Sequence, residues 1–165
     1  MGVGLRVHPR WLLWHGRLGR VWRRASTCDA GGVQVLVDAD NVPVSRLRVV
    51  AAALAELPDA VARIVVAGRS SAVDALDWPE HAVIVRIAGW QEADLALADA
   101  YVADREPLLL VSGDGDFGLL AARHSGPVLV VSTAASGRLR DAARVVDPVL
   151  DGGRGLRDWL TAAEV

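Results

Sequence analysis

Five aspartates stand directly behind apolar segments of this chain or at the start of a following helix. Asp38 and Asp40 occur in VLVDADN, Asp94 in GWQEADLALADA, and Asp114 and Asp116 in LLLVSGDGDF. Two ionised carboxylates about 4 Å apart repel each other by roughly 4 kcal/mol at an effective dielectric near 20. If these side chains meet in space, a bound cation or a set of shifted pKa values must compensate for the repulsion.

Oxygen donors determine which cation would suit such a cluster. Carboxylates and water select hard ions such as Mg²⁺ or Mn²⁺. The chain has a single cysteine, Cys28, and among its four histidines only His124 falls near these motifs, so zinc is disfavoured. A carboxylate-bound Mg²⁺ or Mn²⁺ that activates water implies the hydrolysis of a phosphodiester or a phosphate ester.

Length and composition narrow the class of protein. The 165 residues suit one domain with a sizeable core, and no apolar run approaches the 18 to 20 residues that would cross a bilayer. We therefore expect no membrane association, and the single cysteine favours a reducing cytoplasm. All 18 positively charged residues are arginine, which excludes a lysine-dependent phosphate loop or Schiff base.

The two ends of the chain differ in charge. Residues 1–31 carry six arginines, three of the six tryptophans and one acid, whereas residues 32–165 carry twelve arginines and nineteen acids. We interpret 1–31 as an extension, either disordered or upstream of the natural start, and as an alternative a basic aromatic arm that grips RNA. Residues 32–165 are expected to form the domain that carries the site.

Strand-like and helix-like periods alternate from Val33 onward. Short apolar strands are predicted at 33–38, 62–68, 81–89, 108–113 and 127–133, and helices at about 44–57, 70–76, 92–104, 116–124 and 137–143. Residues 144–150 fit either an edge strand or an ordered tail. The alternation predicts a three-layer, Rossmann-like α/β fold around a mainly parallel five-stranded sheet.

That fold explains why the carboxylates should meet. The carboxyl ends of parallel strands lie at one edge of the sheet, where open α/β sheets bind their ligands. Asp38 and Asp114 follow two of these strands, and Asp94 begins the helix after a third. Each aspartate taken alone also fits a helix cap or a favourable helix dipole. Three such caps at one edge are less expected than one shared site.

The ordered motifs LVDADNVP, EADLALADA, VSGDGDFGLL and STAASGRLRDAARVVDPV resemble the NYN domain of the PIN-like nuclease superfamily over about residues 33–150. The resemblance implies a metal-dependent ribonuclease with a PIN fold and RNA as its substrate. It assigns metal binding to Asp38, Asp94, Asp114 and Asp116, the role of polar companion to Asn41, and a supporting hydroxyl to Ser112; these four acids and Asn41 are the candidate catalytic residues. Asp40 is a supporting candidate. Because lysine is absent, arginines would have to hold the RNA, with Arg46, Arg48, Arg69, Arg123, Arg138 and Arg140 as candidates.

Two other functions fit the same residues. DADNV matches the DxDx(T/V) signature of haloacid-dehalogenase-like phosphatases, with Asp38 as nucleophile and Asp40 as acid/base. The chain lacks the lysine that such enzymes use, and the phosphatase alternative gives Asp94 no role. The second is a non-catalytic PIN-like module that binds RNA or a protein partner. The sequence does not distinguish a monomer from a homo-oligomer.

Overall fold

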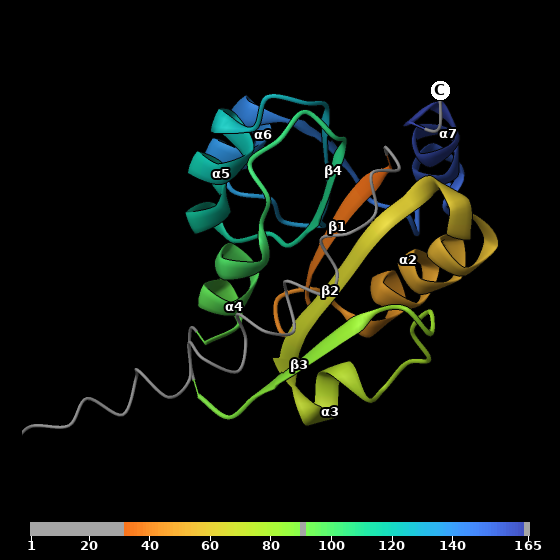
Figure 1. Cartoon of the computed structure of the whole chain (residues 1–165), viewed down its shortest axis with the longest axis vertical. Helices are drawn as coiled ribbons and strands as arrows, with labels where there is room; N and C mark the ends of the chain where they lie inside the picture. Colours follow the sequence, from red (N-terminus) through yellow and green to blue (C-terminus); the bar gives the residue numbers. More distant parts are fainter. Residues whose placement is uncertain (1–31, 90–91, 164–165) are drawn as a thin grey trace, which may run out of the picture.

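The computed structural model describes residues 32–89 and 92–163 (Figure 1). The expectations for residues 1–31 lie outside this range. The fold consists of one sheet covered by helices on both faces, as the alternation of periods predicts.

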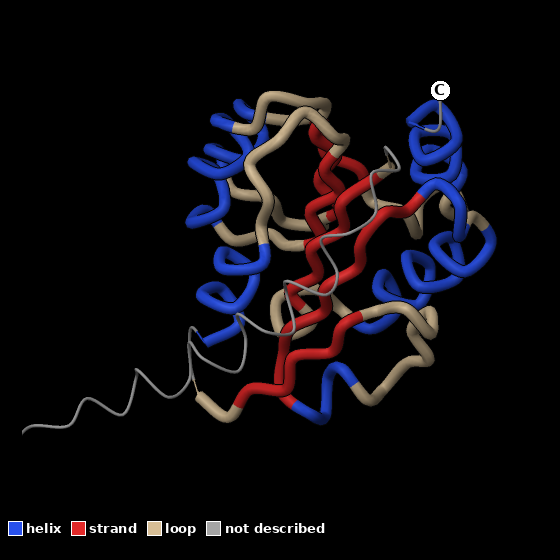
Figure 2. The backbone as a smooth tube through the Cα atoms, viewed as in Figure 1, coloured by secondary structure: helices blue, strands red, loops and turns tan. Residues whose placement is uncertain are grey.

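The sheet runs through the centre of the molecule, and every pair of neighbouring strands is parallel (Figure 2). Its order is β3-β2-β1-β4-β5-β6, so the first strand lies between the second and the fourth. The strands are β1 (Val33–Asp38), β2 (Val61–Arg69), β3 (Val83–Ile87), β4 (Leu108–Val111), β5 (Val128–Val131) and β6 (Arg144–Val146). This topology places the ends of β1 and β4 side by side.

The sheet has six strands in the described residues, and the prediction of five is wrong. The additional strand, β6, contains only three residues and pairs with β5 at the edge of the sheet. So short a segment gives no measurable period, which is why the sequence fitted an ordered tail equally well.

Six α-helices within the described residues cover the two faces: α2 (Val44–Glu56), α3 (Ser70–Val73), α4 (Glu92–Ala100), α5 (Gly118–Arg123), α6 (Gly137–Ala142) and α7 (Arg154–Ala163). Residues of α2, α3 and α7 pack in one apolar cluster and residues of α4, α5 and α6 in another, on opposite sides of the sheet (Figure 1). Helix α7 was not predicted. Leu156 and Leu160, four residues apart, form its buried stripe.

Alternation along β1 decides which layer the first aspartate faces. Val33, Val35 and Val37 pack in the cluster with α2, and Leu36 packs in the cluster with α4. Successive strand side chains point to opposite faces, so Asp38 shares the α4 side with Leu36.

Gln34 is also on that side and is buried, with its amide bonded both to the carbonyl (3.1 Å) and to the N–H (2.8 Å) of Val102. These two bonds fix the chain that leaves α4 against the sheet.

Within residues 32–89 and 92–163, no helix combines the length and the apolar character needed to span a bilayer.

Candidate metal centre

A cavity of about 320 Å³ opens at the carboxyl edge of the sheet. Three of the four predicted metal ligands line it together, Asp38 from the end of β1, Asp94 from α4 and Asp114 from the connection after β4. The fourth, Asp116, is not among the lining residues. The complete lining is Asp38, Asp40, Asn41, Arg69, Ile87, Ala88, Gly89, Ala93, Asp94 and Asp114. Chain segments far apart in sequence thus bring carboxylates to one space, as the parallel sheet predicts.

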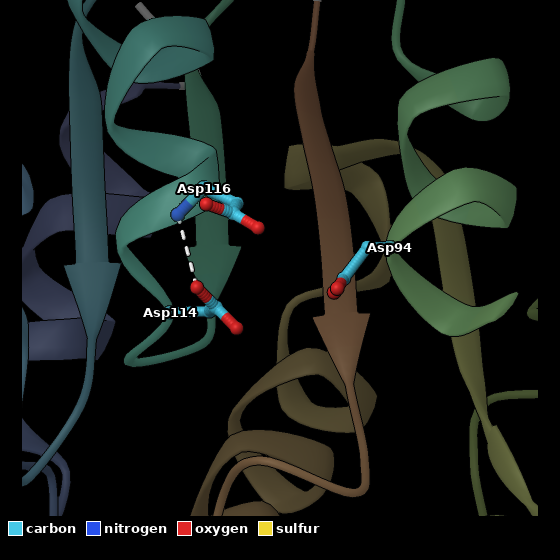
Figure 3. Close-up of side chains that lie close together, drawn as sticks. All are labelled: Asp94, Asp114 and Asp116. Atoms are coloured by element: carbon cyan, nitrogen blue, oxygen red, sulfur yellow. Dashed lines mark hydrogen bonds between the residues drawn. The ribbon is translucent and has the colours of Figure 1, made fainter. Parts of the chain in front are cut away.

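Three carboxylates form the tightest group. Asp94, Asp114 and Asp116 each offer an oxygen within 4.8 Å of the other two (Figure 3). The loop after β4 is shaped by its own acids, because the backbone N–H of Asp116 donates to Oδ1 of Asp114 at 2.9 Å and opens the 3-10 helix Gly115–Phe117. That bond leaves Oδ2 of Asp114 without a protein donor among the described residues.

Asp38 lies in the same cavity but outside this group of three. It is 4% exposed. Its Oδ1 accepts the backbone N–H groups of Asp40 and Asn41, both at 3.2 Å, and its Oδ2 accepts the hydroxyl of Ser112 at 3.2 Å. The sequence grouped Asp38 with the other acids, and the structure gives it a distinct position, deeper and largely satisfied by protein donors.

Burial and neighbouring negative charge raise the pKa values of two of these acids. Burial, followed by the negative charge of Asp94, raises the pKa of Asp38 to about 6 against these hydrogen bonds. Burial and then the charges of Asp114 and Asp116 raise the pKa of Asp94. Binding of a proton or of a metal ion would therefore neutralise the unfavourable negative charge of both carboxyl groups.

Ser112 and Asn41 connect β1 to the loop after β4. The Ser112 hydroxyl donates to Asp38 and accepts the backbone N–H of Asp114 at 3.1 Å. The Asn41 side chain accepts the backbone N–H of Gly113 at 2.8 Å. Both predicted companions therefore position the acid-bearing loops relative to each other.

Gly113, in the loop after β4, lies close to residues that follow β1 and β5. A Cβ atom there would lie 2.8 Å from the Ser132 hydroxyl and 3.1 Å from Oδ1 of Asn41. We expect Gly113→Ala to displace Asn41 and to lower the free energy of unfolding by about 1–3 kcal/mol, the usual cost of overpacking.

Urea unfolding measures this change, and Gly137→Ala is the matched control, because a Cβ at Gly137 meets nothing within 4 Å. Equal stability of the two variants would contradict the tight approach of these loops.

The predicted RNA-binding arginines separate into different environments. Arg69 lines the cavity. Arg46 instead forms an ion pair with Asp147 at 3.0 Å, and this pair connects α2 to the segment after β6. The remaining candidates are exposed and are not among the cavity-lining residues: Arg48, Arg123, Arg138 and Arg140. Of the six candidate arginines, Arg69 is the one that lies at the cavity.

One wall of the cavity was not predicted. It is formed by Ile87, Ala88, Gly89 and Ala93, at the junction of β3 and α4. The Glu92 carboxylate accepts the backbone N–H groups of Ala88 (3.3 Å) and Gly89 (3.2 Å) and holds the junction in shape. The sequence contained one local signal for this contact. Glu92 follows Gly89 by three residues, the spacing at which an acid in the first turn of a helix bonds to the backbone N–H before the helix.

The donor set fits a hard divalent cation. All three grouped side chains offer carboxylate oxygens, and thiol or imidazole ligands are absent from the group. Ligands about 2.1 Å from Mg²⁺ lie at most about 4.2 Å apart, so modest side-chain movement would close the observed spacing around one ion.

Searches of protein-family models and of curated protein sequences found no match to this chain.

Proposed function

We propose that this protein is a metal-dependent ribonuclease of the NYN/PIN-like class that hydrolyses RNA phosphodiester bonds. Mg²⁺ or Mn²⁺ would be held by Asp94, Asp114 and Asp116, with Asp38 beside them. The observation that carries the proposal is the convergence of carboxylates: those of Asp94, after β3, and of Asp114 and Asp116, after β4, have oxygens within 4.8 Å of one another. Asp38, at the end of β1, lines the same cavity as Asp94 and Asp114. The single cysteine supports a cytoplasmic site of action.

The chemistry divides between the ion and the chain. When bound, a divalent cation would activate a water and neutralise charge on the phosphoryl group. Oδ2 of Asp38 accepts one hydrogen bond, from Ser112, and so keeps a lone pair with which to orient that water or accept its proton. Ser112 and Asn41 hold the loops in register, so the acids are positioned before substrate arrives.

The environment of Asp40 favours the nuclease over the phosphatase. A DxD phosphatase needs its second aspartate as an acid/base in the site. Here both oxygens of Asp40 accept hydrogen bonds from Arg69, one from its backbone N–H at 3.1 Å and one from its Nε at 3.0 Å. Asp94, which has no role in the phosphatase, lies in the cluster. A non-catalytic module would use the same cavity without turnover, and an activity assay separates it.

Cleavage of labelled single-stranded and structured RNA by the purified chain, with Mg²⁺, Mn²⁺ or EDTA, tests the proposal. We expect cleavage with either cation, none with EDTA, and none with Asp114→Asn. Asn keeps the Oδ1 that accepts the Asp116 N–H, so this variant should retain the local turn while losing the charge.

Two outcomes of that assay would contradict the proposal. Cleavage that survives both EDTA and Asp114→Asn would reveal a contaminating nuclease. A folded wild-type chain that cleaves none of the RNAs with either cation would favour the binding module.

A further inference from the structure

Among the described residues that line the cavity, Arg69 is the only one with a cationic side chain. The other charged residues in the lining are Asp38, Asp40, Asp94 and Asp114. Arg69 ends β2 two residues beyond Ala67, the residue that pairs with Asp38 in the register of β1 and β2. The guanidinium therefore stands at the same edge of the sheet as the acids.

Asp40 fixes this arginine at two points, backbone and side chain. Its Oδ2 accepts the Arg69 N–H, and its Oδ1 accepts Nε–H. The Arg69 side chain is 66% exposed and that of Asp40 is 22% exposed. A guanidinium carries four further N–H donors on its two Nη atoms, and in the described part of the chain these make no hydrogen bond.

An acidic cavity also presents a difficulty for a polyanion. Four carboxylates repel the phosphates on either side of a scissile bond, and a metal ion at the reacting phosphate does not neutralise its neighbours. A guanidinium fixed at its Nε edge presents a planar pair of donors, which suits two phosphate oxygens.

We propose that Arg69 binds a phosphate of the RNA strand adjacent to the scissile one, and that Asp40 is the positioning residue that holds it there. This inference rests on the proposed function. It selects Arg69 from the candidate arginines by its place in the cavity, and it gives Asp40 a role in substrate binding.

The chain contains a matched control pair. Arg86 and Asp74 also form an exposed arginine–aspartate pair, at 2.7 Å, and neither residue lines the cavity with the acids. Arg69→Met and Arg86→Met remove the same charge and preserve a similar apolar stem. Any difference between them in RNA processing reflects position and not net charge.

The experiment measures steady-state cleavage of a single-stranded RNA oligonucleotide with Mn²⁺ over a range of salt concentrations. We expect Arg69→Met to raise KM about 10- to 100-fold, the effect of losing a charge-assisted hydrogen bond, with kcat within about twofold of wild type. The slope of log(kcat/KM) against log[salt] should become shallower by about 0.7, which is one single-strand phosphate contact. Arg86→Met should leave KM, kcat and slope at their wild-type values.

Asp40→Asn separates positioning from bulk charge. The substitution makes the protein less negative, which by long-range attraction alone would lower KM for RNA. The positioning role predicts the opposite, a raised KM, and an Arg69→Met/Asp40→Asn double variant no worse than Arg69→Met alone. A lowered KM for Asp40→Asn would overturn the positioning role, and Asp74→Asn controls for the charge change.

These measurements distinguish failure of the proposed ribonuclease activity from failure of the role of Arg69. Wild-type protein that cleaves no RNA overturns the proposed function and this inference with it. Wild-type protein that cleaves RNA while Arg69→Met keeps both the wild-type KM and the wild-type salt slope overturns only the inference. Titration of each variant with Mn²⁺ should give wild-type ion binding, which shows that the metal centre is intact.

Discussion

Asp94→Asn is expected to lower the rate of RNA cleavage by about 10³-fold, because a charged ligand contributes several kcal/mol and each 1.36 kcal/mol is one factor of ten in rate. Asp94 supplies one of the three grouped oxygens, and its charge adds to burial in raising the pKa of Asp38. The substitution removes a negative charge from a repulsive cluster and nearly preserves volume, so the folded state should be kept. Single-turnover cleavage of labelled RNA with Mn²⁺ measures the effect.

The same variant separates the proposed nuclease from the phosphatase alternative. A phosphatase built on Asp38 and Asp40 would keep its activity toward a phosphomonoester in Asp94→Asn and lose it in Asp40→Asn. Asp99→Asn is the control on the same helix, since Asp99 is exposed. RNA cleavage by Asp94→Asn within a few-fold of the Asp99→Asn rate would refute the role of Asp94.

Asp38→Asn is expected to stabilise the metal-free protein at neutral pH while impairing cleavage. The folded-state pKa of Asp38, about 6, exceeds its ordinary value of 3.8. A raised carboxyl pKa means that folding favours the protonated form, so stability is lost as pH rises from about 4 to about 6. At pH 7.5 the buried charge costs about 3 kcal/mol, and at pH 4.5 about 1 kcal/mol.

Asn can occupy this position with the same three partners, although the bond with Ser112 reverses its direction. Its Oδ1 can accept the N–H groups of Asp40 and Asn41, and its amide can donate to the Ser112 hydroxyl oxygen. In urea unfolding without metal, the free energy of unfolding of Asp38→Asn should therefore exceed that of wild type by about 3 kcal/mol at pH 7.5 and by about 1 kcal/mol at pH 4.5.

Asp158→Asn, a change at an exposed aspartate of α7, should stay within about 0.5 kcal/mol of wild type. A loss of stability in Asp38→Asn at pH 7.5, or a gain that is independent of pH, would contradict the buried charge.

The sequence predicted most accurately those features that depend on local periodicity and on the place of a residue at the end of a strand. The β-branched run 33–38 predicted β1 with the bounds that the structure has, and the rule that ligands bind beyond the carboxyl ends of parallel strands predicted the edge where Asp38, Asp94 and Asp114 meet. Side-chain alternation along β1 then fixes the layer that Asp38 faces, because Leu36 two residues earlier is in the core beside α4.

Features that depend on long-range contact could not be predicted in this way. The bond from Asp40 to Arg69 joins residues 29 positions apart and depends on the register of β1 against β2. The separate position of Asp38 depends on a hydroxyl 74 residues away, at Ser112. Helix α7, in contrast, could have been predicted from the sequence, because the four-residue spacing of Leu156 and Leu160 is a local helical signal.

Direct binding of Mn²⁺ to the purified chain tests the metal centre most closely. Binding is measured as the decrease in the electron paramagnetic resonance signal of free Mn²⁺. We expect saturable binding by wild type and by Asp99→Asn, and a loss of about 10²-fold or more in affinity for Asp94→Asn and Asp114→Asn, since each removes at least one charge–charge contact worth about 4 kcal/mol at 4 Å. Wild-type affinity in both site variants, or no binding by the wild-type chain at millimolar Mn²⁺, would contradict the metal centre and with it the proposed nuclease.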